Sequence, residues 1–235
     1  MRIIFFLFIF VFMFSVNCLS QKGKTLVGIQ LKPITSLSLM GNGKISNDVS
    51  DVQFETTLTS GFSGGIVVRH NFSNLLAFET GINYVKRKYT LKITDENFIS
   101  NSIFRIIGYE IPALLMIYAQ LGEKIYINGS MGPTMDMFPS SIQTTDSVFN
   151  HVAFRNHIFQ PAISSNLGFE FRTDKSGIIY LGASFQKPFS FIYLSKIGYY
   201  GNNKNFIVQN ELSGSYLTID FRYFFPETKT QNIAE

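Results

Sequence analysis

The sequence alternates between apolar and polar residues in eight separate segments. In one of them, Phe78, Ile82 and Tyr84 alternate with Glu79 and Asn83. A period of two places successive side chains on opposite faces of a β-sheet, so each segment is predicted to be a strand. The segments are residues 25–40, 58–70, 75–93, 104–120, 124–135, 157–172, 177–187 and 213–225. The chain is therefore predicted to be all-β.

The connections between these segments alternate in length. Short connections follow the second, fourth and sixth segments, at residues 71–74, 121–123 and 173–176. Long connections follow the first, third, fifth and seventh, at residues 41–57, 94–103, 136–156 and 188–212. Short turns on one rim and long loops on the other are typical of barrels that cross an outer membrane. The sequence thus predicts an eight-stranded antiparallel up-and-down transmembrane β-barrel.

The composition agrees with a chain that avoids water. Only 15% of the 235 residues are charged, whereas about 25% is usual for soluble domains. The apolar content of 46% excludes a disordered chain, and the single Cys excludes a disulfide framework. A net charge of +4 without a basic cluster argues against a nucleic-acid partner.

The first twenty residues have the layout of a secretory signal peptide. Arg2 precedes an apolar run at residues 3–14, and Cys18 and Ser20 occupy the −3 and −1 positions before Gln21. Two alternatives are a membrane-anchor helix, for which the run is short, and a lipoprotein modified at Cys18. The predicted organisation is a signal peptide at residues 1–20, a barrel domain at residues 21–225 and a polar tail at residues 226–235.

The mature chain contains no apolar run that could form a membrane-spanning helix. The best candidate, residues 106–119, is shorter than the roughly 20 residues that a span requires. It also contains Glu110 and Pro112. The exported protein is therefore expected either to be soluble or to cross a membrane as strands.

Two features of the polar face favour a membrane barrel over a soluble barrel that is polar outside. This face holds many glycines, which make room in the narrow lumen of a small barrel. The glycines are Gly28, Gly65, Gly81, Gly132, Gly168, Gly182 and Gly214. The face also carries charged residues that are predicted to pair in an interior network, because buried charges require partners. They are Arg69, Glu79, Glu110, Glu170, Arg172, Asp220 and Arg222. A lumen filled in this way is expected to be plugged.

The aromatic residues of the apolar face fall into two groups, as expected for girdles at the two membrane interfaces. One group lies toward the short turns: Phe169, Phe171, Phe221, Tyr223 and Phe225. The other lies toward the long connections: Tyr84, Tyr109, Phe159 and Phe185. A further aromatic run, residues 189–200, is interpreted as the seventh strand continuing beyond the membrane. The alternative interpretation is an adhesive surface.

The sequence offers few candidates for chemistry. His70 and Ser73 are a weak candidate pair on the short-turn side. The other candidate set surrounds the third long connection and comprises His151, His157, Asp136, Ser140, Ser141 and Ser147. No His or Cys spacing is typical of a metal site. No catalytic, cofactor-binding or metal-binding residue is therefore predicted.

The order of these features resembles the small outer-membrane β-barrel family common in Bacteroidetes, often described as the porin family or outer membrane protein beta-barrel domain. The resemblance covers residues 26–225. Its landmarks are residues 26–29 (LVGI), 78–84 (FETGINY), 109–115 (YEIPALL), 128–133 (NGSMGP) and 221–225 (FRYFF). The polar tail departs from the family, because many members end on the last aromatic strand. The resemblance implies the fold and an outer-membrane location.

The predicted function is a non-enzymatic integral outer-membrane protein with a role in envelope structure, adhesion or partner docking. Its expected partners are outer-membrane lipid and envelope proteins, reached through the long loops or the periplasmic rim, and no cofactor is expected. A narrower version resembles the barrel component of the gliding and type IX secretion machinery. Two alternatives stay open: a lipid-modifying outer-membrane enzyme, and a soluble periplasmic or secreted ligand-binding barrel.

Overall fold

A computed structural model describes residues 23–35, 44–49, 51–96, 98–173, 175–201 and 204–226. These residues form thirteen β-strands and no α-helix. No helix in this part of the chain is long and apolar enough to cross a membrane. The predicted signal peptide, residues 36–40 of the first predicted strand and the polar tail beyond residue 226 lie outside the described residues.

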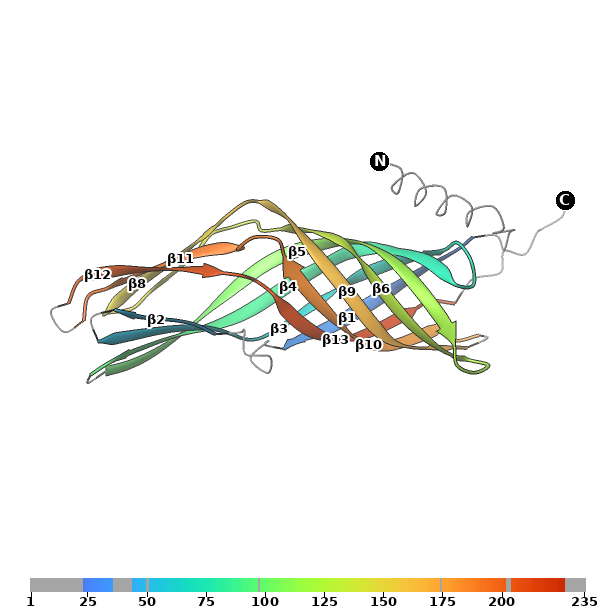
Figure 1. Ribbon diagram of the computed structural model, residues 1–235, viewed down its shortest axis with the longest axis horizontal. Helices are drawn as coiled ribbons and strands as arrows, with labels where there is room; N and C mark the ends of the chain where they lie inside the picture. Colours follow the sequence, from blue (N-terminus) through green and yellow to red (C-terminus); the bar gives the residue numbers. More distant parts are fainter. Residues whose placement is uncertain are drawn as a thin grey trace, which may run out of the picture.

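The larger of two antiparallel sheets closes on itself (Figure 1). Its strand order is β1-β13-β10-β9-β6-β5-β4-β3-β2, and β3 also pairs with β1, so that Gly28 lies opposite Val67. The ring strands are β1 Lys24–Thr35, β3 Val52–Asn71, β4 Leu76–Asp95, β5 Phe98–Gln120, β6 Ile125–Met137, β9 Phe159–Arg172, β10 Ile178–Pro188 and β13 Tyr216–Phe224. The predicted segments fall on these strands, although several ends differ. The predicted antiparallel barrel is therefore present as a closed ring.

The last predicted strand begins later than expected. β13 starts at Tyr216 rather than at Ser213. Gly214 precedes it with a φ of +71°, and a Cβ at this position would lie 2.6 Å from the Ile192 side chain. Positive φ is a conformation that glycine adopts without strain. Gly214 therefore permits a turn, and the prediction that it makes room in the lumen is wrong.

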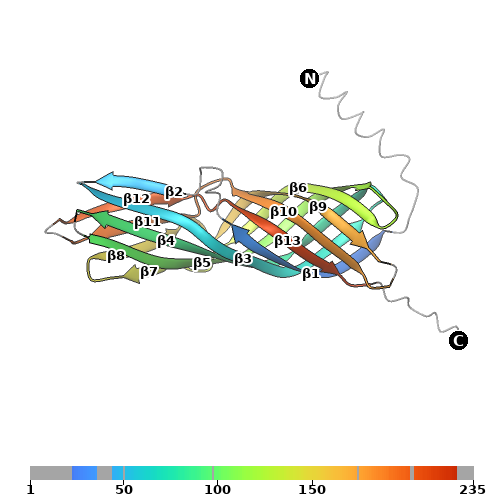
Figure 2. The same cartoon turned by 90° about the horizontal axis from the view of Figure 1, so that it is seen from below.

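Where they are described, the four long connections consist largely of strands rather than loops, and this is the main correction to the predicted fold. Three of them contain β2 Lys44–Val49, β7 Ile142–Thr145, β8 Phe149–Arg155, β11 Tyr193–Tyr199 and β12 Phe206–Leu212, and the fourth, residues 94–103, is formed mainly by the ends of β4 and β5. The strands β12-β11-β8-β7 form a second sheet, and β2 pairs with β3. Both views show these strands continuing the molecule beyond one end of the ring (Figures 1 and 2). We call these five strands, with residues 52–58, 85–95 and 98–108 of β3, β4 and β5, the extension.

The extension has its own apolar core between its two layers of strands. Phe54 of β3 meets the rings of Tyr199 and Phe206, with centroids 5.9 Å apart in both pairs. The buried members of the cluster include Val52, Leu58, Val85, Tyr89, Leu91, Ile93, Phe104, Ile106, Phe149, Ile192, Tyr193, Ile197, Val208 and Leu212. Such a core explains why the long connections are ordered strands.

The aromatic run at residues 189–200 contributes to this core. β10 ends at Pro188, so the seventh strand does not continue as predicted. The chain re-enters a strand at Tyr193, in the other sheet, and Ile192, Tyr193 and Tyr199 are completely buried. Both interpretations of the run therefore need correction. Most of its apolar side chains are buried in the core of the extension, so they neither extend the seventh strand nor form an exposed adhesive surface.

The polarity of the inward and outward faces reverses along a single strand. On β4, Glu79 and Asn83 are buried and Ile82 is exposed, as predicted. Beyond Tyr84 the pattern inverts: the buried positions become Val85, Tyr89, Leu91 and Ile93, and the outward positions become Lys86, Lys88 and Lys92. β3 keeps both halves in register through an irregularity between Leu58 and Ser60.

Candidate functional site

The polar interior of the ring is the most concentrated group of charged side chains in the described residues. Its members come from five ring strands and point toward one another, because each occupies an inward position of the period-two pattern. We call this group the barrel cluster, which consists of Lys32, Arg69, Glu79, Glu170, Arg172, Asp220 and Arg222.

Two arginines and three carboxylates form the centre of the barrel cluster. Arg69 Nη1 lies 2.7 Å from Glu170 Oε2, and Arg69 Nη2 lies 3.0 Å from Glu79 Oε2. Arg222 forms an ion pair with Glu79 and a second with Asp220, the latter with Nη2 2.7 Å from Oδ2. Glu79 therefore bridges two guanidinium groups, and all five side chains are buried.

Neutral side chains complete the hydrogen bonding of these carboxylates. Asn128 Nδ2 donates to Glu170 Oε2 at 3.0 Å, and Asn166 Nδ2 donates to Asp220 Oδ2 at 3.0 Å. Tyr180 donates from its hydroxyl to Asn166 Oδ1 at 2.8 Å. Buried polar groups without partners are costly, so this second set of contacts helps the interior to tolerate so many charges.

The rim of the barrel cluster is formed by two further cations. Arg172 Nε lies 2.8 Å from Glu170 Oε1, and its guanidinium lies 3.9 Å from the centroid of the Tyr126 ring. Lys32 Nζ lies 3.7 Å from Asp220 Oδ2. The barrel cluster thus contains four cations and three carboxylates.

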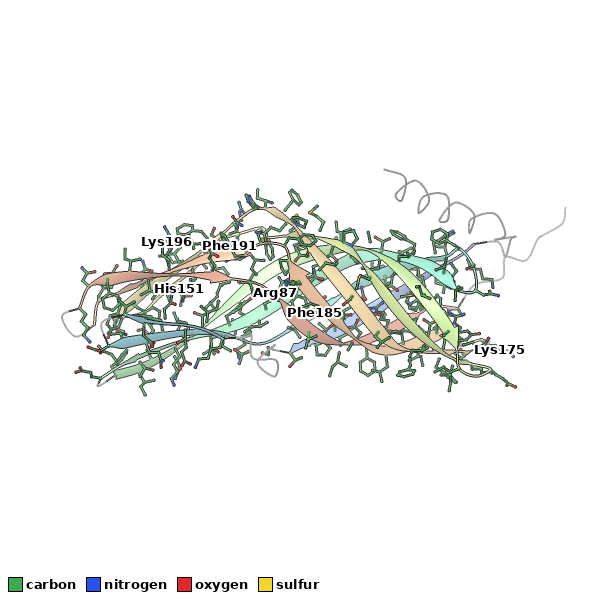
Figure 3. The ribbon with its side chains drawn as sticks, viewed as in Figure 1. Arg87, His151, Lys175, Phe185, Phe191 and Lys196 are labelled. Carbon is green, nitrogen blue, oxygen red and sulfur yellow. The ribbon has the colours of Figure 1, made fainter. Side chains whose placement is uncertain are left out.

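A second, smaller group lies where the ring meets the extension, and we call it the junction cluster. Arg87 Nη2 lies 3.1 Å from Glu110 Oε1 and 3.6 Å from Asp136 Oδ2. Tyr216 donates from its hydroxyl to Glu110, and Gln186 Nε2 donates to Asp136 Oδ1 at 3.0 Å. Figure 3 shows Arg87 near the middle of the long axis. The junction cluster thus brings a single cation against two carboxyl groups.

The structure separates one predicted network residue from the other six. Glu110 contacts Arg87 in the junction cluster, while Arg69, Glu79, Glu170, Arg172, Asp220 and Arg222 lie in the barrel cluster. Sequence reasoning missed Lys32, Arg87 and Asp136. Lys32 lies on the same face of its strand as Gln30, two residues earlier, and could have been found, because Gln30 also points inward. Asp136 lay beyond the predicted end of its strand, and Arg87 is concealed between Lys86 and Lys88.

The outer wall of the ring is apolar over every ring strand. Outward side chains that are about half exposed occur on each of them, and they include Ile29, Ile66, Ile82, Ile111, Leu115, Met131, Leu167, Phe169, Leu181, Ile219 and Phe221. A contiguous apolar surface of this extent is far larger than soluble monomers expose. The shortest ring strand, β13, has nine residues, and a tilted strand of about 9 to 11 residues is long enough to cross a bilayer.

Comparisons with known proteins agree with this architecture. No family model matches the chain, and no curated protein matches it. The crystal structure of the outer membrane protein OprG from Pseudomonas aeruginosa is similar with a TM-score of 0.53 at 12% identity, over 87% of this chain and 97% of OprG. The fold is that of an outer-membrane β-barrel.

Two other solved outer-membrane barrels match more loosely. The outer membrane protease OmpT from Escherichia coli has a TM-score of 0.35 at 8% identity, over 88% of this chain and 97% of OmpT. The beta domain of the Bordetella autotransporter BrkA has a TM-score of 0.26 at 9% identity, over 88% of this chain and 100% of that domain. The likeness to OprG supports the shared barrel fold and agrees with the predicted outer-membrane location.

The structure does not assemble the weak catalytic candidates of this outer-membrane barrel into a common site. His70 Nδ1 lies 2.9 Å from Thr25 Oγ1, whereas Ser73 Oγ accepts the backbone N–H groups of Leu75 and Leu76 within its turn. In the other set, Asp136 belongs to the junction cluster, and Ser147 is exposed beside Asp146.

His151 has a serine neighbour that the sequence did not indicate. Its Nε2 lies 2.9 Å from Ser195 Oγ, and both side chains are buried in the core of the extension. The Phe104 ring lies 4.5 Å from the imidazole, measured between centroids. Burial lowers the pKa of His151 to about 4. No carboxylate orients this pair within the described residues, and neither residue lines an open cleft, so the contact serves packing.

Metal-ligand groups and surface hollows are the remaining places where a site could form. No group of three or more His, Cys, Asp or Glu in the described ranges has the geometry of a metal site. A shallow hollow of about 560 Å³ lies on the outer wall over Gly129, Ser165 and Ala183. Apolar side chains such as Leu115 and Met131 provide nearly all of its exposed surface.

Proposed function

We propose that this protein is an integral outer-membrane β-barrel of eight strands with a plugged lumen, which holds a rigid β-structured extension outside the membrane. Its role is non-enzymatic, in envelope structure, adhesion or partner docking. The observation that carries this proposal is that the apolar face of β4 changes from the outward side to the inward side at Tyr84. Before Tyr84, in the ring, the apolar side chains of β4 face outward, as contact with lipid requires. After Tyr84, in the extension, they face inward, as contact with water requires.

A plugged lumen is supported by what occupies it. The interior of an eight-stranded barrel is just wide enough for side chains. Here it holds the completely buried side chains of Arg69, Glu170 and Tyr180, with Phe224 stacked 4.0 Å from the Arg69 guanidinium. A conducting pore would need these ion-paired groups to move apart.

Membrane insertion is tested by the mobility of the detergent-extracted mature protein in electrophoresis, with and without heating. We expect a compact band that is converted to a slower band on heating, because closed barrels resist detergent until they are boiled. A mature protein that is freely soluble without detergent would overturn the proposal in favour of the soluble barrel.

The plugged lumen is tested separately in planar lipid bilayers. We expect the wild-type protein to show no steady ion conductance. A double variant that removes Arg69 and Arg222, R69A/R222A, is expected to open a small conductance path if it still folds. Stable conductance by the wild type would contradict a plugged lumen while leaving membrane insertion intact.

The enzymatic alternative finds less support, because no accessible His, Ser and acid come together in the described residues. Lipid A and phospholipid profiles of a deletion strain test it. An unchanged profile is expected, and a lost lipid modification would favour the enzyme. The resemblance to Bacteroidetes barrels, including the one in the gliding and secretion machinery, stays a proposal that the neighbouring genes would test.

A further inference from the structure

Three cations stand side by side on the outward face of the extension, directly beyond the apolar wall. Lys86 and Lys88 are outward residues of β4, and Arg105 is an outward residue of β5. The strand register places Lys88 directly opposite Arg105, and it places Lys86 between Phe62 and Ile107. We call these three residues the basic triad.

The basic triad has no acidic partner on its own face. Like charges directly opposite each other in a sheet are destabilising, and no ion pair joins Lys86, Lys88 or Arg105 to a described carboxylate. The carboxylate of the outward face of β3 is Glu55, which pairs with Lys44 at 2.5 Å and lies opposite Lys92. An anion from outside the protein would therefore stabilise these three neighbouring positive charges.

The position of the basic triad along the strands, relative to the apolar wall, indicates where that anion lies. Immediately below it, the rings of Phe62, Tyr84 and Tyr109 form a row, with centroids 5.8 and 5.9 Å apart. Aromatic rows of this kind mark the interface between acyl chains and headgroups. Lys86 follows Tyr84 by two residues, about 7 Å along a strand. The triad thus lies at headgroup level, on the side of the extension.

We propose that the basic triad binds the phosphate groups of an anionic lipid in the outer leaflet. The inference rests on the proposed membrane placement and adds a specific ligand chemistry to it. Arg105 offers a planar fork that suits a phosphate, and the two lysines add point charges. Ser60, opposite Lys88 and exposed, offers a hydroxyl donor beside them.

A lipid fits this position better than an acidic protein. The apolar side chains directly beneath the triad, such as Ile82 and Ile111, provide a surface for the acyl chains of the same molecule. A protein partner would approach from the far end of the extension. There the cationic side chains have acidic neighbours, since Lys92 lies opposite Glu55 and Lys204 pairs with Asp95 at 2.9 Å.

The test is binding of purified diphosphoryl lipid A to the detergent-solubilised mature protein, measured by native mass spectrometry over a lipid titration. Dephosphorylated lipid A is the comparison ligand. The triple variant K86Q/K88Q/R105Q is expected to bind diphosphoryl lipid A about 100-fold more weakly, because each of the three cations near an anionic headgroup contributes about a factor of five. Wild-type binding is expected to weaken with added salt.

Two control variants separate charge at this place from charge in general. K86R/K88R/R105K keeps the charges and is expected to keep most of the affinity. K175Q/K196Q removes two cations outside the triad and is expected to bind like the wild type. Lys175 lies at the end of the barrel away from the extension (Figure 3), and Lys196 lies on β11, in the other sheet from β4 and β5. Heat-dependent mobility of each variant shows that it is folded.

Three results would overturn the inference. They are equal affinity of the folded Gln variant, equal affinity for dephosphorylated lipid A, and binding of polyglutamate that depends on the triad while lipid binding does not. Each leaves the membrane placement intact, because folded barrels were measured. Failure of the wild type to show heat-dependent mobility would instead count against the proposed function itself.

Discussion

The ring and the extension share three continuous strands but have opposite interiors. Inside the ring, β4 contributes Glu79, which bridges two buried arginines. Inside the extension, the same strand contributes Leu91 and Ile93, which are buried in an apolar core. The difference shows that the alternation of a strand does not by itself define an inside, because the surroundings decide which face is buried.

The two regions are therefore expected to be stabilised by different interactions. The extension gains from removing apolar surface from water. The ring gains little from that source if its outer wall faces lipid, and it depends on closure of its backbone hydrogen bonds and on pairing of its interior charges. Each substitution below tests one side of this contrast.

The largest effect is expected from Glu79→Gln. The substitution leaves Arg69 and Arg222 without their shared carboxylate, and breaking a buried ion pair costs about 3–5 kcal/mol. The urea midpoint at which the compact electrophoretic band disappears should fall strongly. Glu55→Gln is the control, because it removes a carboxylate of β3 from a more exposed pair that contributes about 1 kcal/mol or less. Equal midpoints for the two variants would contradict a structural role of the interior charges.

A comparable loss, confined to the extension, is expected from Phe54→Ala. Truncating a buried Phe costs about 3–5 kcal/mol, and Phe54 is completely buried against Tyr199 and Phe206. Limited proteolysis should cut the extension while the heat-dependent band of the ring persists. Ile99→Ala, at a side chain that is 61% exposed, should change neither. Loss of the ring together with the extension would show that they unfold as one unit.

A smaller effect is expected from Gly182→Ala on β10. A Cβ there would lie 2.1 Å from the Tyr180 hydroxyl and 2.5 Å from the Leu167 carbonyl oxygen, so the tyrosine that lies 4.6 Å from the Arg222 guanidinium must shift. Overpacking of this kind costs about 1–3 kcal/mol. Gly122→Ala has nothing within 4 Å of the new Cβ and should stay within about 0.5 kcal/mol of the wild type. The urea midpoint of the compact band measures both.

The smallest effect concerns pH and the extension alone. His151 has a pKa of about 4 because it is buried, whereas in the unfolded chain its pKa is about 6.5. The unfolded state thus binds more protons between these values, and stability falls as the pH falls through 6.5 toward 4. The expected loss between pH 7 and pH 5.5 is about 1 kcal/mol.

Hydrogen exchange of β8 and β11 at the two pH values measures this loss. His151→Gln keeps a side chain that reaches Ser195 but does not titrate, so its exchange should respond less to pH than that of the wild type. An unchanged pH response in the variant would assign the effect to another group.

Much of the ring was predictable because its signal is local. The alternation of Phe78, Glu79, Ile82 and Asn83 is visible within one segment, and it correctly placed the polar side chains inward. The extension was not predictable in this way. Its strands are short, and β7 has only four residues, so each depends on partners from distant connections. The aromatic run at residues 189–200 is visible in the sequence, but only its packing against β3 and its pairing with β8 show that it belongs to the core of the extension.

The candidate site divides along the same line. The sequence by itself determined which ring residues share the polar face, because side-chain direction follows from the period of a strand. Tertiary structure alone decided that Arg87 joins Glu110 and Asp136, that Lys32 reaches Asp220, and that Lys88 stands beside Arg105. These pairings depend on register between strands, and register is fixed by the closure of the ring and the packing of the extension core rather than by any one segment.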